Sequence, residues 1–286
     1  MALDSADPAR RDVGRLRYLG GWALKSDEPA FGGLSGAMMA RGEIIAVSDA
    51  GALVRIGLTG GKPDGRGHIL PVPKGCGDAL YKRDRDAEAL TGTPGTRDIW
   101  LSLERRNAIC RLDGLRRTIT ETFPPAIAKW PEPTGGEALL RMPDGRFLIW
   151  SESRIGIGKQ FSLLRFDRDP TRPDAGVEAM GWRAPAGFRP VDATLLPDGR
   201  ILVLHRKFSI MRWFASALTI IDPAELVRGR IVEGREIARI DGPLIRDNYE
   251  ALASTSEGGR TIVWLLSDDN FHFLQRTLLL KFALMD

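Results

Sequence analysis

The sequence predicts an all-β fold, namely a β-propeller of four-stranded antiparallel blades. Three observations support this prediction. A phrase recurs five times along the 286 residues, its copies are spaced like blades, and each copy is typical of a β-hairpin with further strands behind it. The length suits one propeller as a single domain. We therefore expect a propeller domain over residues 15–286, preceded by an N-terminal extension over residues 1–14.

The repeated phrase has a fixed order of residue types. An acidic residue and an alanine come first, followed by an apolar run, a tight polar turn, a β-rich run and a polar or charged pair. Four copies carry an acid at the first position and the weakest copy carries a serine. The intervals between copies are 53, 49, 55 and 58 residues, which are typical of propeller blades. The five aligned positions are Ser35, Glu88, Glu137, Asp192 and Glu250.

Each copy also contains the strands of a blade. Turns such as Pro143-Asp144-Gly145 separate two apolar runs, which is typical of a hairpin. A third strand-like run follows, and residues 234–240 are one example of a fourth. The last copy stops after its third strand, so we expect the strand in residues 15–24 to close the ring. A sixth blade could lie within residues 57–85, so the prediction is five or six blades.

Charge and hydropathy exclude several classes of protein. The chain has 41 Lys and Arg against 37 Asp and Glu, and its net charge of +4 is spread along the sequence, which argues against a dedicated nucleic-acid binder. No apolar run approaches the roughly 18 residues of a membrane span, and the N-terminus lacks a hydrophobic signal core. No long apolar pattern demands a partner, so we expect a monomer. Cys76 and Cys110 are either two buried thiols or one disulfide.

Hairpin geometry predicts where the charged residues gather. In an antiparallel hairpin the start of the first strand lies beside the end of the second, so the repeated acid and the terminal charged pair meet at the same end of every blade. Repetition around the ring brings them all to one mouth of the central channel. The predicted neighbours are Glu88 with Glu104, Glu137 with Glu152, Asp192 with Arg206, Glu250 with Asp268 and Asp269, and Ser35 with Asp49.

Nine carboxylates at one mouth would repel one another and raise one another's pKa values unless cations intervene. Arginine and lysine side chains could supply some of these cations, and a hard divalent ion such as Ca²⁺ is the other source. Alternatively, the repeated acids accept hydrogen bonds from backbone amides and lock neighbouring blades together. The candidate basic residues are Arg105, Arg106, Arg189, Arg206 and Lys207.

Other residues near the predicted mouth are also candidates. His205 is the histidine that the alignment places there, and the loops over residues 205–216 and 268–276 carry several aromatic residues, among them Trp213. These loops could form a wall over the mouth or pack on the blade tops. Ser35 lies in a Gly-Leu-Ser-Gly-Ala sequence that lacks the last glycine of a nucleophile elbow, so we do not expect a serine nucleophile.

Several long motifs resemble one known family. The strings FGGLSG, DAEAL, LERR, GGEALL with PDGR, GFRPVDATLLPDGRILVLHRKFS, DNYEALA, LLSDDNF and QRTLLLKFAL are similar to those of the phytase-like domain family, "esterase-like activity of phytase", over residues 15–284. The resemblance implies a bacterial protein exported to the periplasm or beyond, and a hydrolase related to calcium-dependent propeller phytases.

The resemblance and the charge pattern together favour a metal-assisted hydrolase of phosphoric esters. Glu104 or Glu152 would be the general base, and Arg105 and Arg206 would neutralise the phosphate. The alternatives are a non-catalytic propeller that binds a ligand or protein, and a hydrolase of carboxylic esters or lactones. The predicted Ca²⁺ ligands are Glu88, Glu137, Glu250, Asp268, Asp269 and Asn270, and the predicted substrate-binding residues are Arg106, Asp192, His205, Lys207 and Trp213.

Overall fold

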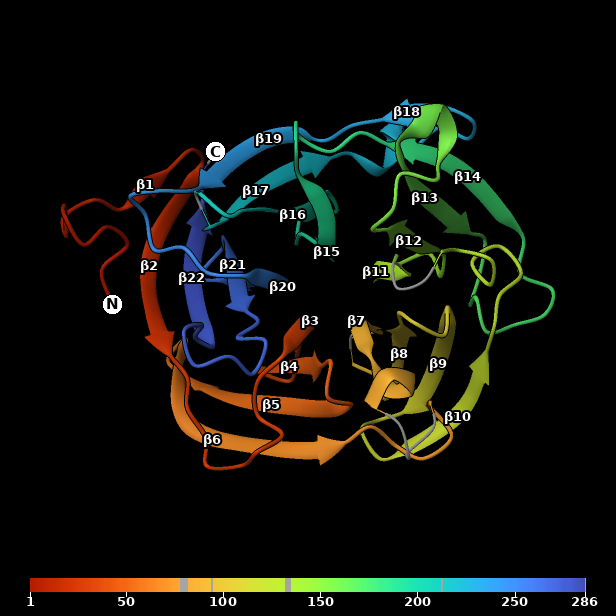
Figure 1. The fold of residues 1–286 in the computed structure, drawn as a ribbon, viewed down its shortest axis with the longest axis horizontal. Helices are drawn as coiled ribbons and strands as arrows, with labels where there is room; N and C mark the ends of the chain where they lie inside the picture. Colours follow the sequence, from red (N-terminus) through yellow and green to blue (C-terminus); the bar gives the residue numbers. More distant parts are fainter. Residues whose placement is uncertain (78–81, 94, 132–134, 212, 286) are drawn as a thin grey trace.

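Five antiparallel sheets form a ring around a central axis (Figure 1). The computed structural model describes residues 1–77, 82–93, 95–131, 135–211 and 213–285. This arrangement confirms the predicted all-β propeller. Within the described residues there are five blades. The segment that could have held a sixth contributes the outer strand of the first blade, because residues 62–71 pair with the strand before them.

The first four blades follow one another along the chain, each running from the axis outward. Blade 1 consists of β3 (Leu34–Ala40), β4 (Glu43–Ser48), β5 (Ala52–Thr59) and β6 (Lys62–Pro71). Blade 2 consists of β7 (Ala87–Gly92), β8 (Asp98–Leu103), β9 (Ala108–Asp113) and β10 (Arg117–Thr122). Blade 3 consists of β11 (Gly136–Arg141), β12 (Phe147–Ser151), β13 (Phe161–Phe166) and β14 (Val177–Trp182), with β18 (Ile231–Val232) paired in parallel to β14. Blade 4 consists of β15 (Arg189–Leu195), β16 (Ile201–Ser209), β17 (Trp213–Ile221) and β19 (Arg235–Ile240).

Blade 5 combines both ends of the chain. Its inner strands are β20 (Tyr249–Glu257), β21 (Arg260–Ser267) and β22 (Leu278–Leu284), and its outer strands are β2 (Leu16–Ala23) and β1 (Asp12–Val13). β2 pairs antiparallel with β22, so the last sheet obtains its fourth strand from the start of the chain. Three short 3-10 helices complete the secondary structure of the described part: η1 (Lys82–Arg85), η2 (Ile157–Lys159) and η3 (Pro223–Glu225).

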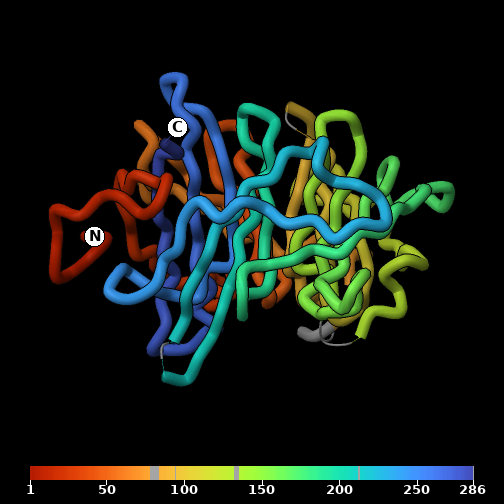
Figure 2. Tube along the Cα trace, turned by 90° about the horizontal axis from the view of Figure 1, so that it is seen from above, coloured from red at the N-terminus to blue at the C-terminus, as the bar shows by residue number. Residues whose placement is uncertain are grey.

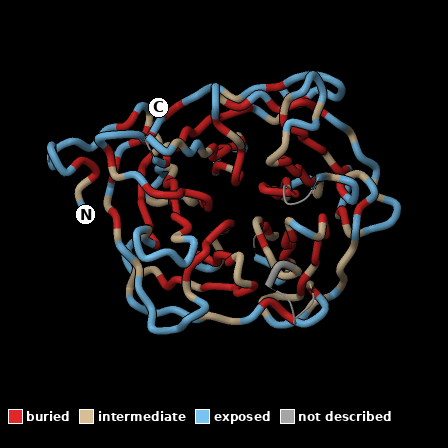
Figure 3. Tube along the Cα trace, viewed as in Figure 1, coloured by how far each residue is buried: buried red, intermediate tan, exposed pale blue. Residues whose placement is uncertain are grey.

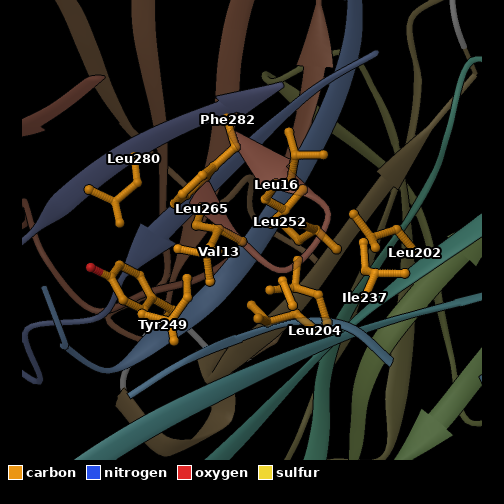
Figure 4. Packing of buried hydrophobic residues seen from close by; sticks show 14 of the residues in the cluster. Val13, Leu16, Leu202, Leu204, Ile237, Tyr249, Leu252, Leu265, Leu280 and Phe282 are labelled. Carbon is orange, nitrogen blue, oxygen red and sulfur yellow. The ribbon is translucent and has the colours of Figure 1, made fainter. Parts of the chain in front are cut away.

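The hydrophobic core lies between neighbouring blades. Side chains alternate between the two faces of a strand, and the preceding blade covers one face of each blade while the following blade covers the other. Buried residues therefore line the strands inside the ring, while exposed residues follow its periphery (Figure 3). Between blades 4 and 5, Leu204 packs with Leu252 and Tyr249 (Figure 4). Burial of each such side chain contributes about 1.5–3 kcal/mol.

The N-terminal segment packs on this ring. Leu3 is fully buried in the core between blades 4 and 5, and its carbonyl oxygen accepts a hydrogen bond from the N–H of Ile245 at 2.7 Å. Cys76 and Cys110 form a disulfide, which joins the segment after β6 to strand β9. In the part of the chain that the structure describes, no helix has the length and apolar character needed to cross a membrane.

Candidate functional site

A β-bulge opens the innermost strand of every blade. In each of the five hairpins the register of the first two strands shifts by one residue just after the first strand begins. A bulge leaves one residue without a ladder partner and re-aims its side chain. The bulge residues are Ser35, Glu88, Glu137, Val191 and Glu250.

The bulge brings the start of the first strand against the end of the second, as the hairpin argument predicted. In four blades the residue after the second strand donates its N–H to the carbonyl oxygen two residues before the bulge. We call three positions of each blade the rim: the residue two before the bulge, the bulge residue itself and the residue after the second strand. The bonded pairs are Asp49 to Gly33 (2.9 Å), Glu104 to Asp86 (2.9 Å), Glu152 to Gly135 (3.4 Å) and Asp268 to Asn248 (2.8 Å). In blade 4 the corresponding pair in the ladder is Arg206 and Arg189.

Blades 2 and 3 bring five acids of the rim together. One carboxylate oxygen each from Glu104, Glu137 and Glu152 lie within 4.8 Å of one another, and Asp86, Glu88 and Glu104 satisfy the same limit. The Glu104 and Glu137 carboxyl groups are also hydrogen-bonded to each other. We call Asp86, Glu88, Glu104, Glu137 and Glu152 the carboxylate cluster.

The close approach of blades 2 and 3 depends on a glycine in the repeat. A Cβ atom at Gly135 would lie 2.4 Å from the carbonyl oxygen of Glu104, a contact that no larger residue could make. Gly135 thus allows the backbone that carries Glu104 to approach the strand that carries Glu137. The Gly-Gly-Glu order of the third copy is therefore a requirement of the cluster's packing.

Burial and mutual repulsion hold protons on the cluster. Burial raises the pKa of Glu104 to about 7, and the neighbouring Asp86 and Glu152 add to the rise, while the hydrogen bond with Glu137 and the nearby Arg105 oppose it. Burial also raises the pKa of Glu88 and of Glu137 well above the usual range, and neighbouring acids contribute in both cases. A hydrogen bond between two carboxyl groups requires a proton on one of them. The cluster therefore holds protons near neutral pH or binds a cation in their place.

Arg206 connects the cluster to blade 5. Its guanidinium group donates to Glu152 at 3.4 Å, to Asn248 at 2.9 Å, and forms an ion pair with Glu250. Arg189 forms a second ion pair with Glu152. Two arginines of blade 4 thus compensate part of the negative charge of blades 3 and 5.

The rim of blade 5 is a hydrogen-bonded network. The amide of Asn248 donates to Glu250 at 3.0 Å and to Asp268 at 3.2 Å. Burial and the charge of Glu250 raise the pKa of Asp268 to about 9. Two predicted ligands lie outside this network: the Asp269 carboxylate accepts from the N–H of Gly33 in the rim of blade 1 at 3.1 Å, and the Asn270 amide donates to Gln275 at 2.7 Å.

Asp192 does not belong to the rim. Val191 occupies the bulge of blade 4, and Asp192 corresponds to Ala89 of blade 2, one residue deeper along the channel. Its carboxylate accepts hydrogen bonds from the backbone N–H groups of Leu252 at 2.7 Å and Ala37 at 3.4 Å. Asp192 therefore joins the inner strands of blades 4, 5 and 1, as the alternative interpretation of the repeated acids expected. Burial outweighs these bonds and raises its pKa.

His205 does not face the mouth either. Neighbouring residues of a strand point to opposite faces, so His205 packs against Trp182 of blade 3, whereas Arg206 reaches the rim acids Glu152 and Glu250. The imidazole stacks on Trp182, and its Nε2 accepts a hydrogen bond from the indole N–H at 3.1 Å. It is fully buried, and burial lowers its pKa to about 3. This histidine is a neutral core residue.

The remaining predicted residues lie in three places. Arg105 stays beside the cluster, where its Nε donates to Asp86 at 2.8 Å. Arg106 turns outward to Glu121 of strand β10, with an Nε–oxygen distance of 3.1 Å. Lys207 and Trp213 line a separate pocket. The predicted substrate-binding set is therefore not assembled at the carboxylate cluster.

Sequence reasoning missed Asp86 and Asn248. Both lie two residues before a rim glutamate, in the strings DAEAL and NYEAL. In blades 1 and 3 the same position is glycine, so the repeat does not carry a polar residue there in every copy. The signal was the recurrence of a polar residue in the equivalent place of two copies.

The composition of the cluster suits a hard cation. Its donors are all carboxylate oxygens, the ligands that Ca²⁺ prefers. Two oxygens on one Ca²⁺ lie at most about 5 Å apart, because each is about 2.3–2.6 Å from the ion. The 4.8 Å limit satisfied by Glu104, Glu137 and Glu152 falls within that range. These three residues could hold such an ion with little rearrangement.

Comparisons with known proteins agree with this fold. A family model described as "Esterase-like activity of phytase", Phytase-like, matches residues 29–271. A comparison with curated protein sequences finds no match. Among solved structures, the chain is similar to glutaminyl cyclase from Myxococcus xanthus at 12% identity and a TM-score of 0.53, covering 95% of this chain and 97% of that one. It is also similar to U3-55K at 8% identity and a TM-score of 0.50, covering 92% and 98%. At such identities the likeness shows the propeller fold alone.

Proposed function

The chain belongs to the Phytase-like family, and on that premise we propose that its carboxylate cluster is the active site of a metal-assisted hydrolase of phosphoric esters. One observation carries the proposal. Glu104, Glu137 and Glu152, from two neighbouring blades, bring oxygen atoms within 4.8 Å of one another. Such an arrangement of acids is costly to fold unless it binds something positively charged.

The carboxylate cluster is where a cation would bind. Glu137 and Glu152 would hold Ca²⁺, and Glu104 would lie beside the ion as the general base, with Asp86 and Glu88 near it. A bound Ca²⁺ polarises phosphoryl oxygens and lowers the pKa of water. Of the ligands predicted from sequence, Glu250 and Asp268 would contribute through the network around Asn248.

The protein's own groups supply the proton chemistry and the positive charge. Glu104, with its pKa raised to about 7 by burial, is suited to accept a proton from water near neutral pH. Glu152 is held by Arg189 and Arg206, which fixes its orientation. Arg105 has a side chain 46% exposed and lies beside the cluster, so it is placed to meet an anionic substrate from solvent.

An oxidising compartment suits this protein. The Cys76–Cys110 disulfide persists where thiols are not kept reduced, as in the periplasm or outside the cell. We therefore infer that the enzyme works after export.

The metal part of the proposal is tested by calorimetry on chelator-treated protein. We expect calcium to bind, and a concentration of 100 times Kd to raise the free energy of unfolding by about 2.7 kcal/mol. Glu137→Gln should weaken calcium binding about tenfold or more, because it removes one charged ligand. Glu178→Gln, on the outer strand β14, should leave it unchanged. Unchanged binding in Glu137→Gln would contradict the assignment.

The catalytic part is tested by turnover of two aryl esters, 4-nitrophenyl phosphate and 4-nitrophenyl acetate. We expect hydrolysis of the phosphate ester, and a loss of about 10²-fold or more in kcat for Glu104→Gln. Turnover of the acetate alone would favour a carboxylic ester hydrolase. Calcium binding without turnover of either ester would favour a non-catalytic binding propeller.

A further inference from the structure

A pocket lies on blade 4, on the opposite face of the strands that carry the rim arginines. It has a volume of about 480 Å³ and is lined by residues before β15, on β16, β17 and β19, and in the connection to β20. The β16–β17 hairpin beside it extends beyond the neighbouring loops at one end of the molecule (Figure 2).

Strand alternation separates this pocket from the carboxylate cluster. Arg189 and Arg206 are ladder partners and face the cluster. Lys207 follows Arg206 along β16, so its side chain points to the other face, together with Phe188. A ligand in the pocket would contact Lys207 and not the rim acids.

The lining of the pocket is rich in positive charge. Lys207, Arg239 and Arg246 contribute three cations, against one acid, Asp241. Within the described residues the Lys207 ammonium group makes no ion pair or hydrogen bond. It lies over the Phe188 ring at 5.7 Å, and Arg239 lies over the same ring at 5.0 Å. Arg239 is also paired with Glu236. Lys207 is therefore the cation most available to an anionic group.

An aromatic surface accompanies these cations. Trp213 lines the pocket and is 52% exposed, although burial of an aromatic ring is favourable. Its backbone has a φ of +58°, a conformation that bulky residues rarely adopt. The fold thus holds a large apolar ring beside the cationic group.

We propose that this pocket is a binding site for a small organic anion with a flat apolar body. The anionic head would meet Lys207, with Arg239 and Arg246 adding to the positive field, and the flat body would lie against Trp213. The site does not depend on the proposed hydrolase activity, because it shares no side chain with the carboxylate cluster.

Two phosphonates test the proposal: phenylphosphonate, which has both parts, and methylphosphonate, which has the head alone. Binding is measured by calorimetry in the presence of a chelator, so that the carboxylate cluster repels anions. We expect phenylphosphonate to bind more tightly than methylphosphonate. Lys207→Met should weaken the binding of phenylphosphonate about tenfold, because it removes one charge-assisted contact.

Trp213→Asn distinguishes the contribution of the apolar body of the ligand from that of its anionic head. Asparagine tolerates a positive φ, so the backbone is preserved. This variant should weaken the binding of phenylphosphonate about tenfold and leave the binding of methylphosphonate unchanged. Lys62→Met, at an exposed position of β6, should leave both unchanged, and melting temperatures verify that all the variants fold.

Three results would overturn the proposal. The first is no binding of phenylphosphonate up to about 10 mM, a concentration at which a binding free energy of about −3 kcal/mol would still be detected. The second is binding that Lys207→Met leaves intact. The third is binding that Glu137→Gln abolishes, which would place the anion at the carboxylate cluster. None of these readouts uses turnover, so failure of the hydrolase proposal and failure of this one are distinguishable.

Discussion

Blades 2 and 4 share one hairpin geometry and differ in the charge that they place at the rim. Blade 2 carries three acids there, Asp86, Glu88 and Glu104. Blade 4 carries two arginines and an apolar residue at the same positions, Arg189, Val191 and Arg206. The repeat thus fixes where side chains meet, and departures from the repeat determine the charge balance of the site.

The difference has a physical reason. Blade 4 lies between blade 3, which contributes Glu152, and blade 5, which contributes Glu250, and both carboxylates are about 10% exposed. A third acid at this place would add repulsion to two buried charges. Arg206 instead contacts both, so the rim combines a negative side on blades 2 and 3 with a cationic side on blade 4.

The test with the largest expected effect removes the cation of blade 4. Arg206→Met should destabilise the protein by about 3–5 kcal/mol at pH 8, because Glu152 and Glu250 would remain buried without their partner. Denaturant unfolding measures the change. Arg165→Met is the matched control. Its side chain is 18% exposed against 15% for Arg206, but its partner Glu178 is 37% exposed, so its loss should cost about 1 kcal/mol or less. Equal losses in the two variants would contradict the compensating role of Arg206.

A second test concerns the acid that blade 4 buries one step deeper. Asp192→Ala should cost about 2 kcal/mol, because the backbone N–H groups of Leu252 and Ala193 would lose their acceptor. Asp192→Asn keeps one acceptor oxygen and should cost about half as much. Blade 2 has alanine at the equivalent place, Ala89. A loss in Asp192→Ala no larger than that in Asp192→Asn would show that the bonds between blades contribute little.

The blades were predictable from sequence because the hairpin pattern repeats along the chain. The mouth was predictable because the start of the first strand of a hairpin lies beside the end of the second. The one-residue bulge was not predictable. The strings AEA and VDA look equivalent, yet the bulge residue is Glu88 in one and Val191 in the other, so Asp192 was placed one position too far out. A one-residue shift exchanges the faces of a strand.

The same limit explains His205 and Arg106. His205 was grouped with Arg206 because both end a strand, but only the register decides which of two neighbours faces the channel. Arg106 lies in the turn after β8, and its side chain pairs with Glu121, a residue of a different strand. The disulfide likewise depends on the proximity of Cys76 to β9, which the spacing of two cysteines does not reveal.

A third test uses the buried imidazole that distinguishes blade 4 from blade 2, where Leu103 holds the equivalent place. The pKa of His205 is lowered from its ordinary value of 6.5 to about 3, so the unfolded chain binds more protons between these pH values. Stability should therefore fall as the pH decreases through this window, by about 1.4 kcal/mol at pH 5.5 relative to neutral pH.

His205→Gln isolates this contribution. Glutamine can accept the Trp182 N–H and does not titrate, so the difference in unfolding free energy between wild type and variant should change with pH as described. Other groups titrate in both proteins and cancel in the difference. A difference that stays constant between pH 7 and pH 5.5 would show that the imidazole is not held neutral.

The smallest expected effect comes from the cation of blade 2. Arg105 carries the same charge as Arg206 and follows the rim residue Glu104, but its side chain is 46% exposed and water screens its pair with Asp86. Arg105→Gln should therefore change the free energy of unfolding by about 0.5 kcal/mol or less, and raised salt should reduce even that difference. Denaturant unfolding at low and high salt measures both. A loss above about 1.5 kcal/mol would mean that blade 2 also depends on its own arginine, and the contrast between the two rims would then lie in geometry rather than in charge. A loss within the expected range, beside a large one in Arg206→Met, would show that burial decides which of the two cations the fold requires.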